Sequence, residues 1–248
     1  MGVTVEREGA AAVVVMDYPA KRNAINPDSA KEIAAALNEA AAAADVCGVV
    51  LTGAGTFSSG GDLRGAVDRQ TMSPEERRVI VYGAYQGLIR TIVNLPVPTM
   101  AAVDGPAIGM GLDMALACDS TFVGPDGWLH QGWGRVGLVP ATGGELLIRR
   151  RNPSVIWKLL AERPNLDGPA CEALGLAEAV TEGAARAAAV QRVEQLAPMS
   201  RAALEGYVEL HRTGLRNDLD AYFDLALEHQ LVLLASPEFR ERVSKVLS

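Results

Sequence analysis

The sequence predicts an α/β protein with a parallel sheet and a helical C-terminal region. Up to Pro140, short apolar runs alternate with segments of helical spacing, which is typical of folds whose parallel strands are buried on both faces. After Pro140 the strand signals nearly vanish, and helical periodicity dominates from Gly144 to Leu247. No low-complexity linker or fixed-period repeat interrupts the chain. We therefore expect a single domain over residues 1–248.

The expected strands lie in the first half of the chain. Two β-prone runs, at residues 3–6 and 11–17, flank Glu8-Gly9 and predict a hairpin. Three further apolar runs predict buried strands, at residues 46–51, 99–103 and 120–123.

The expected helices follow from capping residues and from apolar spacing. Asn26-Pro27-Asp28 is a helix-start signal, and the pattern behind it continues to Asp45. A further helix is expected to begin at Gly109 and run to Cys118. A long helix is expected over residues 74–93, and one side of it carries Val79, Tyr82, Tyr85, Leu88, Ile89 and Ile92.

Composition excludes several classes of protein. A chain of 248 residues that is 49% hydrophobic buries a core without disulfide or metal staples. Its net charge of -7 argues against a general nucleic-acid binder. Cys47, Cys118 and Cys171 stand singly, so we expect no metal or redox site. The N-terminus lacks the features of a secretory signal, and runs such as residues 10–16 are too short to span a bilayer. We expect a cytoplasmic protein that contacts neither membrane nor nucleic acid.

Two glycine-rich loops follow predicted buried strands. The first covers Gly53–Leu63 and the second Val103–Asp113, where parallel α/β folds place ligands. Neither loop has the spacing of a phosphate-binding or dinucleotide motif. Glycines here allow close approach of backbone N–H groups to a ligand, and a pair of such groups can hold an oxyanion. Alternatively, the glycines of these two loops serve only to form turns, and the loops bind no ligand.

Four ordered segments resemble the motifs of the crotonase (enoyl-CoA hydratase/isomerase) superfamily. They are Lys21-Arg22-Asn23-Ala24-Ile25-Asn26, Phe57-Ser58-Ser59-Gly60-Gly61-Asp62-Leu63, Pro98 to Asp119, and Gly137-Leu138-Val139-Pro140-Ala141-Thr142-Gly143-Gly144. The resemblance covers roughly residues 13–152 and implies a ββα-spiral core over about residues 1–195. Residues 196–248 would then form a helical trimerisation or lid region, with a homotrimer or hexamer as the assembly. The amphipathic pattern of residues 219–234 fits an intramolecular core equally well.

The resemblance also implies roles for residues of the loops. The backbone N–H groups of Gly61 and Met110 would be the oxyanion donors, with Met110 in place of the family's usual glycine. Ser58 and Gly60 would lie where the loop backbone meets the adenine of coenzyme A.

The resemblance places two cations near the phosphates of coenzyme A. Lys21 and Arg22 would meet these groups, and a solvated basic pair is the alternative interpretation. No cofactor is expected beyond the coenzyme A that forms part of the substrate.

The acid–base residues depart from the family pattern. The first of the two glutamates of family hydratases aligns with Asp113, a shorter carboxylate that could instead complement the helix dipole. The second glutamate aligns with Trp133, seven residues before Pro140. Hydration by two glutamates is therefore disfavoured, and so is isomerisation that needs this second carboxylate. Family dehalogenases carry tryptophan here, but their nucleophilic aspartate would fall at Ala141, which excludes that reaction.

Other polar residues lie near the expected pocket. His130, expected in a loop, is a candidate for proton transfer or an ordinary hydrogen-bonded histidine. Arg135 could pair with Asp113 or with a substrate carboxylate. Glu145 is expected mainly as a helix-cap acid, and Trp128 and Trp133 as walls of an apolar acyl pocket.

Three functional hypotheses follow. The first is a lyase or isomerase type of enzyme that acts on an acyl-CoA through an enolate, with Asp113 and His130 as candidate catalytic residues. The second is a carbon–carbon bond hydrolase or decarboxylase of a β-dicarbonyl substrate, which needs no coenzyme A. The third is a non-catalytic acyl-CoA-binding subunit.

Overall fold

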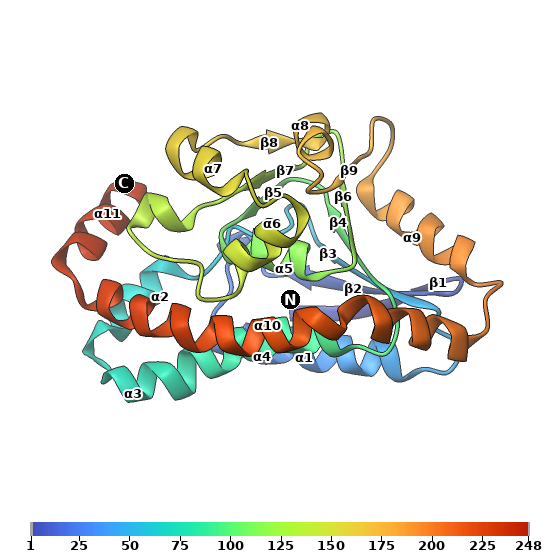
Figure 1. The fold of residues 1–248 in the computed structure, drawn as a ribbon, viewed down its shortest axis with the longest axis horizontal. Coiled ribbons are helices and arrows are strands. Elements are labelled where there is room, and N and C mark those ends of the chain that lie inside the picture. The colour runs from blue at the N-terminus through green and yellow to red at the C-terminus, as the bar shows by residue number, and fades with distance from the viewer. Residues whose placement is uncertain (1, 248) are drawn as a thin grey trace.

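A computed structural model describes residues 2–247, in which a central sheet lies between helices (Figure 1). The sheet has six strands in the order β1-β2-β3-β4-β6-β9. These strands are β1 (Gly2–Glu8), β2 (Ala11–Asp17), β3 (Gly48–Gly53), β4 (Thr99–Val103), β6 (Ser120–Val123) and β9 (Glu178–Ala179).

The connectivity of this sheet agrees with the sequence prediction. β1 and β2 form the expected antiparallel hairpin, in which Glu8 pairs with Ala11. Every other neighbouring pair in the sheet is parallel. The carboxyl ends of β3 and β4 therefore point the same way, and the two glycine-rich loops leave the sheet at one edge.

Both faces of the sheet are covered. In β2, Ala11, Val13 and Val15 pack with α9 (Ala185–Leu196), whereas Ala12 and Val14 face the larger core that contains α1 (Pro27–Ala42). A buried strand needs apolar side chains on both sides, which explains why this run is continuous rather than alternating.

The long helix expected over residues 74–93 is correct in extent but wrong in detail. Helical structure runs through α3 (Pro74–Glu76), a π-helical segment (Arg77–Tyr82) and α4 (Gly83–Asn94). The wider π turn changes the register at its N-terminal side. Val79, expected on the apolar side, is consequently 62% exposed, while the five apolar residues from Tyr82 onward are buried.

A second, three-stranded sheet supports the loops of the site. Its order is β5-β7-β8, and its strands are β5 (Pro106–Ile108), β7 (Trp128–His130) and β8 (Leu166–Asp167). These short strands and β9 were not predicted, because two or three residues carry too little periodicity to read. The expectation that His130 lies in a loop is therefore wrong, because His130 is the last residue of strand β7.

The remaining helices surround the site and the C-terminal half. They are α2 (Leu63–Asp68), α5 (Met110–Ala117), α6 (Gly144–Arg151), α7 (Ile156–Glu162), α8 (Gly168–Ala173), α10 (Arg201–Ala235) and α11 (Pro237–Leu247). Short 3-10 turns occur at η1 (Pro19–Lys21), η2 (Arg69–Thr71) and η4 (Trp133–Val136).

The C-terminal helices pack on the chain's own core. The long helix α10 runs beside α4, and α11 reaches η4 and α2 (Figure 1). Their buried residues, such as Phe223 and Phe239, belong to the main hydrophobic cluster. The amphipathic pattern of residues 219–234 thus serves an intramolecular core, the second of the two interpretations given for it.

Candidate active site

Asn23 joins the first glycine-rich loop to the segment before it. Its side-chain oxygen accepts from the Tyr18 amide at 2.7 Å, and its side-chain nitrogen donates to the Thr56 carbonyl at 2.7 Å. Its own carbonyl accepts from the Ser58 hydroxyl at 2.7 Å. Asn23 is wholly buried, so all three bonds are shielded from water. The asparagine of the motif is therefore structural, and it fixes the loop that leads to Gly61.

The two glycine-rich loops touch at Gly60. A Cβ atom on Gly60 would lie 2.5 Å from the Ile108 carbonyl oxygen and 3.7 Å from the Met110 amide nitrogen. Together with its φ of 96°, this contact explains why glycine stands there. Ser58 also exchanges backbone hydrogen bonds with β5, at 2.9 Å to Pro106 and 3.0 Å from Ile108.

This contact brings two backbone amides of the two loops close together. Neither the Gly61 nor the Met110 amide donates a hydrogen bond within the described part of the chain. Met110 is the first residue of α5, and the space beside Gly61 is open. Two unused donors, one of them at a helix N-terminus, suit a developing negative charge on oxygen. The backbone geometry accommodates Met110 at a position where the family usually has glycine.

Asp113 lies one turn into α5 and is completely buried. Its Oδ2 accepts from the Thr142 hydroxyl at 2.5 Å and from the Trp133 indole nitrogen at 3.1 Å. Its Oδ1 has no hydrogen-bond partner of good geometry among residues 2–247. That oxygen packs against the backbone of Gly144, where a Cβ atom would lie only 2.1 Å away.

Burial raises the pKa of Asp113 to about 7. The hydrogen bonds from Thr142 and Trp133 and the nearby Gly144 amide act in the opposite direction, because they favour the ionised form. Every one of these partners is uncharged, so desolvation prevails. Asp113 can therefore hold or release a proton near neutral pH, as a general acid–base requires.

Trp133 does more than line a pocket. Its indole lies across Gly109, where a Cβ atom would be 3.8 Å from the ring nitrogen, and from there it donates to Asp113. At the position where the sequence comparison expects a second carboxylate, the chain has a neutral hydrogen-bond donor. The site thus contains one buried carboxylate. Thr142, its closest partner, was not singled out from sequence, because an isolated threonine in a loop carries no signal.

The residues expected to meet coenzyme A lie in different environments. Ser58 and Gly60 are buried, and the Ser58 hydroxyl accepts from the Gly60 amide at 3.1 Å. Lys21 and Arg22 are exposed, and the Lys21 amine lies 3.4 Å from a carboxylate oxygen of Asp62. Of these four residues, only Lys21 and Arg22 are exposed enough to meet a ligand that approaches from solvent. The roles of all four in binding coenzyme A stay predictions.

His130 and Arg135 are not in contact with Asp113 in the structure. His130 is buried, its Nδ1 lies 3.0 Å from the Pro164 carbonyl, and its Nε2 has no partner among the described residues. Its backbone carbonyl accepts from the Gly109 amide at 2.9 Å, which supports the second loop. The suggested pairing of Arg135 with Asp113 is wrong, because Arg135 is exposed on η4 while Asp113 is enclosed by uncharged groups. A role toward substrate stays a prediction for both residues.

Glu145 acts as an acid of the first turn of α6. It accepts from Arg149 at 3.0 Å, one turn further along the helix. No side chain caps this helix through a hydrogen bond among the described residues, so Glu145 acts as a first-turn acid and an ion-pair partner and not as a cap.

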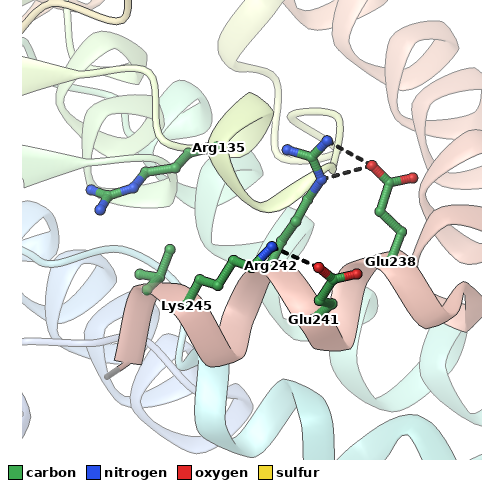
Figure 2. A pocket seen from close by; sticks show the side chains of 6 residues that line it. Arg135, Glu238, Glu241, Arg242 and Lys245 are labelled. Carbon is green, nitrogen blue, oxygen red and sulfur yellow. Dashed lines mark hydrogen bonds and ion pairs between the residues drawn. The ribbon is translucent and has the colours of Figure 1, made fainter.

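A cavity of about 320 Å³ lies between η4 and α11 (Figure 2). Charged side chains line it, among them Arg135, Glu238 and Arg242, and Arg242 pairs with Glu238. Its lining includes neither an oxyanion amide nor Asp113. We therefore identify the site from the geometry around Asp113 and not from this cavity.

Across residues 2–247, no cluster of three or more His, Cys, Asp or Glu side chains could hold a metal ion. None of the helices in that range is long and apolar enough to cross a membrane.

The fold and the candidate site together point to a class: an α/β enzyme in which two unused backbone amides, of Gly61 and Met110, lie near one buried carboxylate, Asp113. A family model described as enoyl-CoA hydratase/isomerase matches residues 6–244. The chain therefore belongs to the enoyl-CoA hydratase/isomerase, or crotonase, family, whose members act on acyl-CoA thioesters.

Similar proteins agree with this assignment. The chain is 32% identical over 241 residues to a probable enoyl-CoA hydratase of Rhodobacter capsulatus, which covers 95% of this chain and 91% of that protein. It is 30% identical over 183 residues to a short-chain-enoyl-CoA hydratase of Clostridium acetobutylicum, covering 73% and 69% of the two chains. The crystal structure of an enoyl-CoA hydratase from Bacillus halodurans matches with a TM-score of 0.91 at 20% identity, over 99% of this chain and 100% of that one. The α/β crotonase fold with a long C-terminal helical region is thereby confirmed.

Proposed function

We propose that the protein transfers a proton at the α-carbon of an acyl-CoA, with Asp113 as its only carboxylate acid–base. The amides of Gly61 and Met110 would hold the thioester oxygen while negative charge develops there. The carboxylate would take the α-proton, and the electron pair of the broken C–H bond would move into the enolate. One observation carries the proposal: a buried carboxylate with a pKa of about 7 lies one helical turn after an oxyanion amide.

The neighbours of Asp113 favour this chemistry over hydration by two carboxylates. Trp133 donates a hydrogen bond to Asp113 and cannot act as a base toward water. Asp113 has no exposed surface, so bulk water does not reach it in the structure. Exclusion of water protects a carbanion-like intermediate from uncontrolled protonation.

A direct test needs no knowledge of the natural acyl group. The protein is incubated in D₂O with butyryl-CoA, and deuterium incorporation at the α-carbon is followed by mass spectrometry. We expect exchange by the wild type and a loss of about 10²–10⁴-fold in Asp113→Asn, the range for removal of a general acid–base. Asp126→Asn, which removes an exposed carboxylate, is the matched control. Full exchange by Asp113→Asn would show that the proposed base is wrong.

A second candidate uses the same site on a β-dicarbonyl compound. Carbon–carbon cleavage or decarboxylation also produces an enolate, and one carboxylic acid is enough to protonate it. The single carboxylate beside Trp133 suits this reaction. Calorimetric titration with coenzyme A separates the two candidates, since micromolar binding supports the acyl-CoA enzyme and no binding supports the alternative. Binding of coenzyme A without exchange of any thioester would instead indicate a non-catalytic acyl-CoA-binding subunit.

The assembly also belongs to the proposal. Large apolar side chains of α10 remain exposed, namely Tyr207, Leu210, Leu225 and Val232. The family resemblance leads us to expect a homotrimer or hexamer, for which light scattering after size-exclusion chromatography gives the mass. A monomer at micromolar concentration would contradict this expectation. The division at about residue 195 and the cytoplasmic location stay predictions.

A further inference from the structure

The two oxygens of Asp113 are held differently. Oδ2 accepts two hydrogen bonds, from Thr142 and Trp133, whereas Oδ1 lies beside the Gly144 backbone and has no hydrogen bond of good geometry among residues 2–247. A buried acceptor without a well-formed hydrogen bond is costly, so the position of Oδ1 requires an explanation. Two donors on one oxygen also prevent the carboxylate from rotating freely, which leaves Oδ1 in a defined direction.

Hydrogen bonds from helix side chains hold the loop that carries Thr142. Each of the three consecutive residues before Thr142, Val139–Ala141, binds one such side chain through its backbone. These are Gln230, Tyr222 and Gln86, at 3.1, 3.2 and 3.0 Å respectively. Two of the three side chains come from α10. The long C-terminal helix thus fixes the backbone that delivers the Thr142 hydroxyl to the carboxylate.

We propose that Thr142 is a positioning residue, which with Trp133 holds Oδ2 of Asp113 and directs Oδ1 to exchange the proton with substrate. This proposal rests on the proposed function, because it assumes that Asp113 is the acid–base group. The hydroxyl of Thr142 is fully buried and lies 2.5 Å from Oδ2. A donor at that distance stabilises the ionised carboxylate and fixes the atom from which the proton leaves.

A purely structural hydroxyl would behave differently, and the chain offers one for comparison. Thr121 is also buried, and its hydroxyl donates to the Ala115 carbonyl at 2.8 Å. Ala115 lies on α5, the helix that carries Asp113. Thr121→Val therefore removes a buried hydroxyl bonded to the same helix without touching the carboxylate.

The test follows the protonation of Asp113 itself. The chain has three tryptophans, so a ¹⁵N-labelled sample gives three indole resonances, and Trp133→Phe identifies the one bonded to Asp113. In the wild type this resonance should move with pH, with a midpoint near 7. Thr142→Val should raise that midpoint by about one pH unit, because a donor that favours the ionised form is lost. Thr142→Ser should restore the midpoint, and Thr121→Val should leave it unchanged.

The outcomes separate this inference from the proposed function. An unchanged midpoint in Thr142→Val, or an equal shift in Thr121→Val, would overturn the positioning role. If the valine variant does not fold, Thr142→Ala is titrated in its place with the same two outcomes. The deuterium exchange of Asp113→Asn is scored separately. Loss of exchange in that variant with an unmoved midpoint in Thr142→Val means that only the positioning inference is wrong.

Discussion

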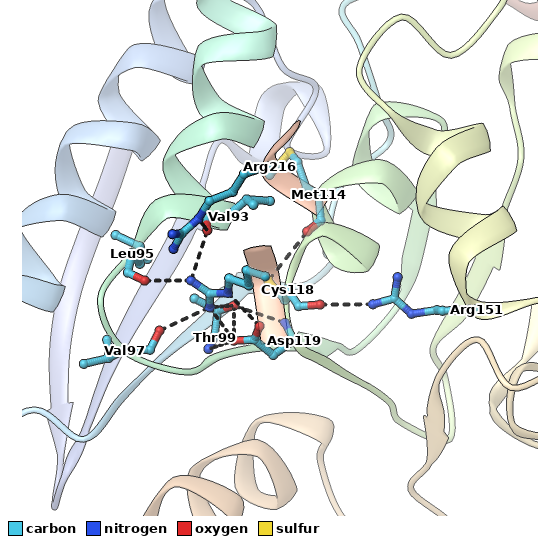
Figure 3. Close-up of polar contacts among 10 residues, drawn as sticks. Val93, Leu95, Val97, Thr99, Met114, Cys118, Asp119, Arg151 and Arg216 are labelled. Atoms are coloured by element: carbon cyan, nitrogen blue, oxygen red, sulfur yellow. Dashed lines mark hydrogen bonds and ion pairs between the residues drawn. The ribbon is translucent and has the colours of Figure 1, made fainter. Parts of the chain in front are cut away.

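Two carboxylates near opposite ends of α5, one fully buried and one largely buried, have opposite electrostatic environments. Asp113, in the first turn, has only neutral partners, and burial raises its pKa to about 7. Asp119 lies two residues after the helix, close to Thr99 (Figure 3). It pairs with the guanidinium of Arg212, whose side chain is 1% exposed. Burial would raise the pKa of Asp119 too, but the hydrogen bonds and charge of Arg212, with help from Thr99, hold it below its ordinary value.

The partners account for the difference in pKa more than the depth of burial does, since the Asp119 side chain is only 15% exposed. Arg212 also donates to the carbonyls of Val93, in the last turn of α4, and of Leu95 and Val97, which follow the helix. That cluster fixes α10 to the core with a charge that cannot be removed at ordinary pH. Among the described residues, the hydrogen-bond partners of Asp113 are all neutral, so desolvation prevails and the group remains titratable. One carboxylate serves as an anchor and the other is available for chemistry.

The largest expected effect comes from breaking the anchor. Arg212→Met leaves Asp119 buried without its counter-ion and removes donors from three carbonyls. We expect the free energy of unfolding to fall by about 3–5 kcal/mol, the range for removal of one partner of a buried pair. Urea denaturation measures this loss. Arg216→Met is the control, since Arg216 makes a single 3.4 Å contact with Val93, and a loss as large as that of Arg212→Met would contradict the special role of the anchor.

A second test compares the two carboxylates by the pH dependence of stability. For Asp113 the folded-state pKa is raised, so between about pH 4 and 7 the folded protein keeps a proton that the unfolded chain loses, and stability falls as pH rises. Asp113→Asn removes this penalty. The variant should therefore gain stability relative to wild type as pH increases, by about 4 kcal/mol at pH 8.

Asp119→Asn should show the opposite sign. The pKa of Asp119 is lowered, so its pairing stabilises the folded state above its ordinary pKa, and this stabilisation is lost as pH falls. The variant should be less stable than wild type at neutral pH, with a smaller difference in acid. Urea midpoints at pH 4, 6 and 8 measure both variants, and parallel curves would show that the two environments do not differ as described.

The smallest of these effects concerns the space beside Asp113. Gly144→Ala would place a Cβ atom 2.1 Å from Oδ1 in the present geometry, so the carboxylate has to move. We expect a stability loss of about 1–3 kcal/mol and a fall in α-proton exchange of about 10²-fold, as for a misplaced catalytic group. Gly87→Ala in α4 is the control, because nothing lies within 4 Å of its Cβ position. Exchange unchanged in Gly144→Ala would show that the position of Oδ1 does not matter.

Much of the molecule could be predicted from the sequence because its signals are local. Continuous apolar runs predicted β2, β3, β4 and β6, and the order of four motifs indicated the family. The π turn before Gly83 and the short strands β5 and β7 were not predictable, since they depend on contacts with other segments. The same limit applied to Thr142, which reaches Asp113 from 29 residues away in the chain.

The sequence by itself determined the α/β class and the two glycine-rich loops, and it predicted that Asp113 and Trp133 stand where the family resemblance expects two glutamates. Only the tertiary structure decided what these residues do to one another. It placed the Trp133 indole and the Thr142 hydroxyl on one oxygen of Asp113, and it left the other beside the Gly144 backbone. Desolvation and hydrogen bonding depend on neighbours distant in sequence, so a carboxylate's pKa and its reactive oxygen emerge only when the chain has folded.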